Sequence, residues 1–131
     1  MDFSLSQQLR EEIMHRFGDR HPEAGEGDRV ATFRCPSGAI GDVVVDVDGS
    51  GVIVEIVEMT HGHFDDGGPD EVVETCTEFL NDLFHDEVVV WSAAGGRSGG
   101  WFYRSHRSDD VPPEGARAGI WSGPWIDEMD E

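Results

Sequence analysis

The chain contains no lysine: its nine basic residues are all arginines, set against 28 aspartates and glutamates. The formal net charge of the 131 residues is therefore -19. Such a surface repels nucleic acid phosphates and anionic membranes, so we expect neither of these as a partner. The same charge attracts basic proteins and can raise the rate at which they associate.

Cysteine is also scarce. Cys35 and Cys76 lie far apart and form no CxxC pair, which favours reduced thiols over a disulfide framework. Apolar runs are only three or four residues long, too short to cross a bilayer. The N-terminus has neither the basic nor the apolar region of a secretory signal. We therefore expect a cytoplasmic protein.

Hydrophobic periodicity predicts two helices. In residues 5–17, Leu5, Leu9, Ile13 and Phe17 recur every fourth residue. In residues 69–85, seven apolar side chains follow the spacing of one helix face. The outer face of this second helix carries Glu71, Glu74, Glu78 and Asp82.

Strict alternation predicts strands. In the first strand of a predicted hairpin, Val43, Val45 and Val47 face one way, and Asp42, Asp46 and Asp48 face the other. After a glycine-rich turn, the pattern resumes with Val52, Val54 and Ile56 opposite Glu55. Further strands are predicted at 30–34, 87–92 and 101–104, the last two joined by a glycine-rich loop.

This order of elements predicts one α+β domain over residues 1–107. It would contain a mostly antiparallel sheet of about five strands with two helices packed on one face. The strands at 52–56 and 87–92 are expected to be parallel neighbours through a right-handed crossover. Residues 108–131 form a C-terminal tail, whose tryptophans favour partial docking, with an edge strand near residues 118–121.

One segment has the residue types of a metal site. In an extended chain His61, His63 and Asp65 would project on one side, as a divalent transition metal requires. With a further ligand such as Glu58 or His85, the protein would be a metal-binding protein or a metal-dependent enzyme. The alternative is that these polar residues line a strand end and cap the second helix.

No other pattern indicates an enzyme, and no cofactor is expected. Cys76 lies on the apolar stripe of the second helix, where a cysteine is usually an inert small hydrophobe. The glycines at 95–100 lie between two strands and match neither a P-loop nor a dinucleotide fingerprint. We therefore predict no catalytic residue.

The segment His61-Gly62-His63-Phe64-Asp65, the helix from Glu71 to Phe84 and the strand that follows it resemble small bacterial proteins. Those proteins in turn are similar to the immunity partners of polymorphic bacterial toxins. The resemblance covers about residues 40–104. It implies a toxin-neutralising role and supplies no catalytic residues.

Charge and resemblance together predict an interaction protein that binds a basic toxin domain through a carboxylate-rich sheet face or helix edge. The residues expected to steer the partner are Asp42, Asp46, Asp48 and Glu55. The residues expected to form a rim and an aromatic anchor are His63, Asp65, Asp66 and Trp101. Two alternatives remain for the acidic charge: a general device for solubility, or adaptation to a salt-rich cytoplasm.

Overall fold

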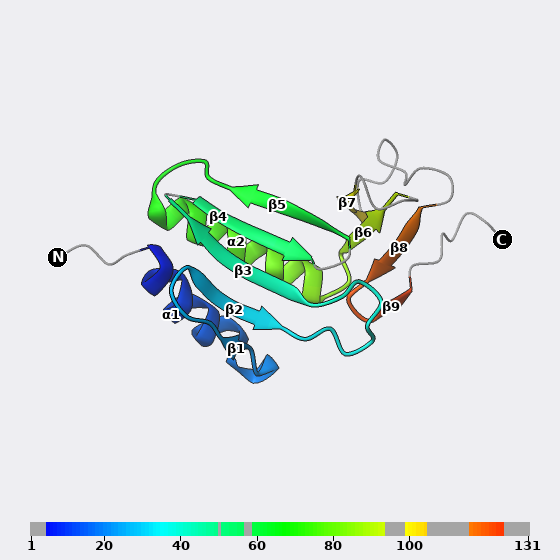
Figure 1. The fold of residues 1–131 in the computed structure, drawn as a ribbon, viewed down its shortest axis with the longest axis horizontal. Helices are drawn as coiled ribbons and strands as arrows, with labels where there is room; N and C mark the ends of the chain where they lie inside the picture. The colour runs from blue at the N-terminus through cyan, green and yellow to red at the C-terminus, as the bar shows by residue number, and fades with distance from the viewer. Residues whose placement is uncertain (1–4, 50, 57–58, 94–98, 105–115, 125–131) are drawn as a thin grey trace.

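The computed structural model describes residues 5–49, 51–56, 59–93, 99–104 and 116–124. Within these ranges the chain forms two α-helices, one short 3-10 helix and nine strands (Figure 1). The helical elements are α1 (Leu5–Phe17), η1 (Gly18–Arg20) and α2 (Pro69–Phe84). The strands are β1 (Glu23–Ala24), β2 (Arg29–Phe33), β3 (Val43–Asp48), β4 (Gly51–Ile56), β5 (Thr60–Phe64), β6 (Val88–Ser92), β7 (Gly99–Tyr103), β8 (Arg117–Ile120) and β9 (Gly123–Pro124).

The first five strands form one antiparallel sheet in the order β1-β2-β3-β4-β5. Its centre is the hairpin of β3 and β4, in which Val43 faces Ile56 and Val45 faces Val54. These four side chains are buried, because alternation along each strand turns them to the same side of the sheet. The predicted α+β class, the hairpin and a five-stranded sheet are confirmed.

The membership of that sheet differs from the prediction. Residues 60–64 pair as β5 with the free edge of β4, and Met59 N, just before β5, donates to Ile56 O at the end of β4. Strand β6 belongs to a second sheet, in the order β7-β6-β8-β9, and has antiparallel partners on both edges. The expected parallel pairing of residues 52–56 with 87–92 is therefore wrong.

Both helices contribute to one hydrophobic core. From α1 come Leu9, Ile13 and Phe17, spaced every fourth residue as predicted. Phe17 meets Phe84 of α2 edge to face, with ring centroids 5.3 Å apart. The same core cluster contains the inward-facing side chains of β2, β3 and β4. In Figure 1, α2 lies behind the sheet as the reader views it, and it contacts β4 and β5.

The C-terminal part of the chain folds back onto this core. Strand β8 lies where an edge strand is expected near residues 118–121, but it is not at the edge of its sheet, because it pairs with both β6 and β9. Trp121 is 6% exposed and lies against Phe84, with ring centroids 4.7 Å apart. Ser122, the residue after Trp121, donates two hydrogen bonds to the carboxylate of Asp86, from its N (3.0 Å) and from its Oγ (2.6 Å). Residues 116–124 thus belong to the same folded unit as the helices.

Candidate functional site

The outer sheet face is the side of β3, β4 and β5 that points away from the core. We define it by six residues: Val44, Asp46, Ile53, Glu55, His61 and His63. The register aligns Val44, Glu55 and His61 in one row across the three strands. Of the four residues expected to steer a partner, Asp46 and Glu55 therefore share this face. Asp48, the exposed last residue of β3, alternates onto the same side as Asp46, and Asp42 directly precedes the strand.

Arginines from β2 and the loop after it compensate two of these carboxylates. Arg29 Nε lies 3.1 Å from Asp46 Oδ1. Arg34 Nη1 lies 2.8 Å from Asp42 Oδ2, and Arg34 Nε lies 2.7 Å from Glu23 Oε2. Hydrogen bonds and charge from Glu23 and then Asp42 raise the pKa of Arg34, which stays protonated. The negative potential near Asp42 and Asp46 is reduced accordingly, because each carboxylate has a guanidinium at contact distance.

Glu55 and Asp48 differ from Asp42 and Asp46 because they have no arginine at contact distance among the described residues. Neither forms an ion pair with any residue in the described part of the chain. The cross-strand partner of Glu55 on β5 is His61, and its partner on β3 is the apolar Val44. Among the described residues, the outer sheet face therefore keeps two carboxylates without an arginine partner, fewer than the spacing of its aspartates predicted.

The three potential metal ligands do not assemble into a site. His61 and His63 both project from the outer side of β5, with their rings edge to face and centroids 5.2 Å apart. Asp65 follows the end of the strand. No group of three histidine, cysteine, aspartate or glutamate side chains in the described ranges is arranged to hold a metal ion. His85, one of the further ligands considered, instead contacts Asn81 O through Nδ1 at the end of α2, and Glu58 lies outside the described residues.

His63, Asp65 and Asp66 are nevertheless brought together at the start of α2. They line a depression of about 70 Å³ together with Val72 and Thr75 of that helix. All three side chains are exposed. The predicted rim residues therefore lie beside the first turns of α2, next to additional carboxylates at Asp70 and Glu71.

Trp101 lies apart from that rim. Its cross-strand partner is the buried Val90, and its ring packs on Phe79 of α2 with centroids 4.8 Å apart. It covers Gly62, which faces the core side of β5, whereas His63 faces the outer side. Trp101 thus fills space between the sheets and α2, on the opposite side of β5 from the histidine with which it was expected to form one contact.

The outer face of α2 carries an acidic stripe, which consists of Glu71, Glu74, Glu78 and Asp82. At 3.6 residues per turn these positions fall on one side of the helix, over a length of about 16 Å. Glu71, Glu74 and Glu78 are exposed, and the helix contains no lysine or arginine. None of the four carboxylates forms an ion pair within the described residues. Within the described ranges, no arginine compensates the charge of the acidic stripe.

Sequence reasoning placed these four residues on the helix surface but did not select them as the site. The sequence does indicate that their charge lacks a nearby cation, because no arginine occurs between Arg34 and Arg97. Every carboxylate in that segment must therefore find its cation elsewhere in the chain. Asp46 of β3 meets Arg29 and Asp42 meets Arg34, whereas Asp48 and the carboxylates of the acidic stripe meet no arginine in the described part of the molecule.

Tyr103 reports the potential of the acidic stripe. Burial raises the pKa of Tyr103, and the negative charges of Asp82 and Glu78 raise it further. A neighbouring carboxylate acts in this way because it disfavours the charged phenolate. The same negative charges that oppose ionisation of Tyr103 would attract a cationic side chain.

Tyr103 is the only tyrosine, so the ultraviolet absorption of its phenolate follows a single group. We expect Glu78→Gln to lower the pKa of Tyr103, because one of the charges opposing ionisation is removed, while Glu55→Gln leaves it unchanged. Since the pKa in the folded state is raised, stability should fall as pH rises above the ordinary value of 10.0. Identical titration curves for Glu78→Gln and the parent protein would show that the acidic stripe sets no local potential.

The two cysteines are free thiols, one buried and one half-buried. Burial raises the pKa of Cys76 to about 12, so its thiol stays protonated at neutral pH. Cys35 is half-buried, and its Sγ lies 3.4 Å from the carbonyl oxygen of Trp121. Both residues act as packing groups, in agreement with the position of Cys76 on the apolar face of α2.

No family model, curated protein or solved structure matches this chain. Among the described residues, no helix is both long enough and apolar enough to cross a membrane.

Proposed function

We propose that this protein is an acidic interaction protein that binds and neutralises a basic partner, as immunity proteins inhibit bacterial toxins. The observation that carries the proposal is the acidic stripe of α2, in which four carboxylates share one helix face without a cation among the described residues. In this proposal the protein acts in the cytoplasm, where a toxin domain would reach its target.

The acidic stripe has an energetic cost that supports a role in binding. Glu74 and Glu78 are four residues apart, as are Glu78 and Asp82. Like charges at this spacing destabilise a helix by about 0.2–0.5 kcal/mol per pair. A protein that needed charge only for solubility would gain the same hydration from carboxylates spaced so that they do not repel. A concentrated stripe instead produces a directed field, which accelerates encounter with a basic surface.

The acidic stripe also fits the geometry of a docking site better than the outer sheet face does. A partner that approaches Asp42 and Asp46 must displace or accommodate Arg34 and Arg29, each already bound to a carboxylate. A partner that approaches Glu74 and Glu78 meets no such competitor in the described residues. We therefore assign first contact to α2 and the adjoining rim, and a secondary contribution to Glu55 and Asp48.

The test uses the polypeptide encoded by the reading frame next to that of this chain. We expect this polypeptide to contain a basic domain that arrests bacterial growth when produced alone. Co-production of the acidic protein should restore growth, and the purified pair should associate more slowly as salt is raised. Growth arrest that persists in the presence of the acidic protein would contradict the proposal.

A second measurement addresses adaptation to salt, the competing explanation of the charge. If the carboxylates serve mainly to hold water in a salt-rich cytoplasm, the protein should unfold in dilute buffer and fold in molar salt. If they serve to bind a partner, it should be folded in dilute buffer. Circular dichroism at low and high salt separates the two cases. A requirement for molar salt would refute the proposed role of the charge.

A further inference from the structure

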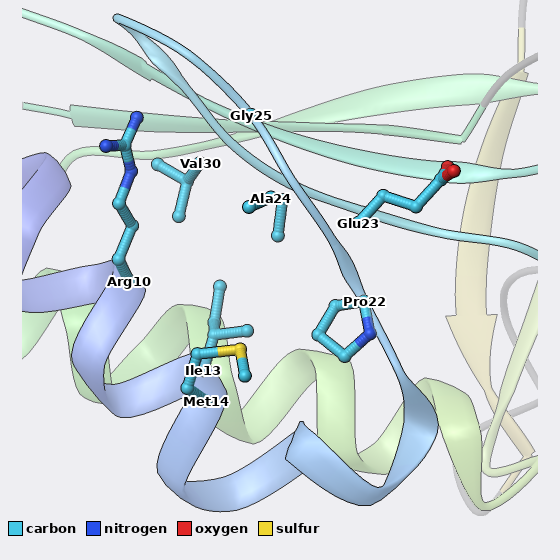
Figure 2. A pocket seen from close by; sticks show the side chains of 9 residues that line it. Arg10, Ile13, Met14, Pro22, Glu23, Ala24, Gly25 and Val30 are labelled. Carbon is cyan, nitrogen blue, oxygen red and sulfur yellow. The ribbon is translucent and has the colours of Figure 1, made fainter.

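A cavity opens between α1 and β1. Its volume is about 190 Å³, and its walls are mainly apolar. Figure 2 shows Ile13 and Met14 of α1 on one side and Pro22, Ala24 and Val30 on the other. A dry cavity of about 150 Å³ can hold a benzene ring. This cavity is therefore large enough for an aromatic or branched aliphatic side chain.

Arg10 supplies an unused hydrogen-bond donor at the wall of the cavity. Its Nη2 donates to Gly27 O (2.8 Å) and to Arg29 O (2.9 Å), which fixes the guanidinium against the loop between β1 and β2. Its Nε is buried and has no hydrogen-bond partner in the described structure. A buried N–H group without an acceptor carries a desolvation penalty, which an incoming carbonyl oxygen would remove.

Two features around the cavity favour a peptide segment over a free small molecule. Strand β1 is at the edge of its sheet, so one side of its backbone has no strand neighbour among the described residues. An extended peptide can pair with such an edge while its side chains enter adjacent pockets. In addition, the side chain of Met14 at the cavity is 57% exposed. Among the described residues, it is the large apolar side chain that is exposed to solvent. Methionine is well suited to adapt to a partner's side chain.

We propose that this cavity anchors an extended segment of the basic partner protein. An apolar side chain of that segment fills the space between Ile13, Met14 and Ala24, and a backbone carbonyl accepts the hydrogen bond from Arg10 Nε. This inference rests on the proposed function for the identity of the partner. The loop after Ala24 contains Glu26 and Asp28, both exposed, so basic residues that flank the apolar anchor would be favoured.

The test needs no knowledge of the partner. The protein is labelled with carbon-13 at its methionine methyl groups, which places one reporter at the cavity (Met14) and one in the core (Met59). The probes are N-acetyl-phenylalanine amide, N-acetyl-glycine amide, and two blocked tripeptides in which phenylalanine is flanked by arginines or by glutamates. We expect the phenylalanine amide to shift the Met14 resonance with a dissociation constant of about 1–10 mM, without shifting Met59. The glycine amide should shift neither.

Variants and the tripeptides sharpen the test. Ala24→Leu fills the cavity and should weaken binding of the phenylalanine amide at least tenfold, whereas Ala116→Leu, near β8, should leave it unchanged. Arg10→Lys keeps the charge but removes the Nε–H group, and should weaken binding roughly fivefold. The arginine-flanked tripeptide should bind about tenfold more tightly than the glutamate-flanked one at low salt. An unshifted Met59 resonance verifies that each variant is folded.

Three results would overturn the anchor site: no shift of Met14, equal binding to Ala24→Leu, or equal binding of the two tripeptides. If Ala24→Leu disturbs the fold, nuclear Overhauser contacts between the phenylalanine ring and the Met14 methyl group decide the matter in the parent protein. Failure of these probes while the neighbouring polypeptide is still neutralised would remove only the anchor site. Probe binding without neutralisation would remove the proposed function and leave the cavity as a peptide site.

Discussion

Glu78→Arg is expected to slow association with the basic partner at least tenfold at low salt and, in the same protein, to raise stability by about 1 kcal/mol. The first effect follows because the centre of the acidic stripe changes sign. The second follows because Glu74 and Asp82, each four residues from position 78, change from repelling a neighbour to attracting it. Stopped-flow association rates and urea unfolding measure the two effects.

The control for this prediction is Glu55→Arg on the outer sheet face. It changes the net charge by the same amount, so any effect of total charge alone should be equal in the two variants. We expect the association rate to fall several-fold more for Glu78→Arg than for Glu55→Arg. Equal losses would show that the partner senses net charge without a preferred face. A larger loss for Glu55→Arg would assign first contact to the sheet.

Gly62→Val is expected to destabilise the protein by about 3 kcal/mol. Gly62 is buried on the core side of β5, and the Trp101 ring occupies the space that a side chain would need. A Cβ at this position would overlap the ring, with two further ring carbons at 2.8 and 2.9 Å. Trp101 cannot retreat without losing its contact with Phe79. The predicted hot-spot tryptophan therefore has a structural role in joining β7 to the first sheet and α2.

Gly68→Ala provides the comparison. Gly68 precedes α2 with φ -78°, and a Cβ added to it would meet no atom within 4 Å. Alanine at this position should therefore change stability by less than about 1 kcal/mol. The double variant Gly62→Ala with Trp101→Ala should be more stable than the sum of the two single changes implies, because the overlap is removed. Additive losses in urea unfolding would show that Gly62 and Trp101 do not share this space.

Elements with a strong local pattern could be predicted from the sequence alone. The repeat of Leu9, Ile13 and Phe17 specifies α1, and the apolar stripe that includes Cys76 and Leu80 specifies α2. The β3–β4 hairpin follows from alternating valines around a glycine-rich turn. In each case one face of the element is buried, so its apolar residues recur in the sequence with the period of a helix or a strand.

Elements that depend on a neighbour could not be predicted in this way. Strand β5 contains glycine and two histidines, a composition that also suits a loop or a metal site. It is a strand because it pairs antiparallel with the edge of β4 that β3 leaves free. That pairing, together with β8 on the other side of β6, divides the strands between two sheets. Local sequence patterns carry no information about which edge a strand will choose.

In the candidate site, too, local patterns could be predicted and contacts between distant elements could not. Alternation correctly turns Asp46 and Glu55 away from the core, but the arginine beside Asp46 comes from a different strand. Only the register between β2 and β3 brings Arg29 to Asp46, so the compensation was not visible in the sequence. The lack of a cation near α2 along the chain was visible, since the helix and its flanks contain no basic residue other than histidine.

The decisive measurement is carboxylate labelling of the free protein and of its complex with the basic partner. A carbodiimide and an amine convert exposed carboxylates to amides, and mass spectrometry of peptides gives the extent at each residue. We expect Glu71, Glu74 and Glu78 to be protected in the complex, while Glu55 and Asp48 react at nearly the same rate as before. Full reactivity of these three glutamates in a complex that protects Glu55 would contradict docking on α2.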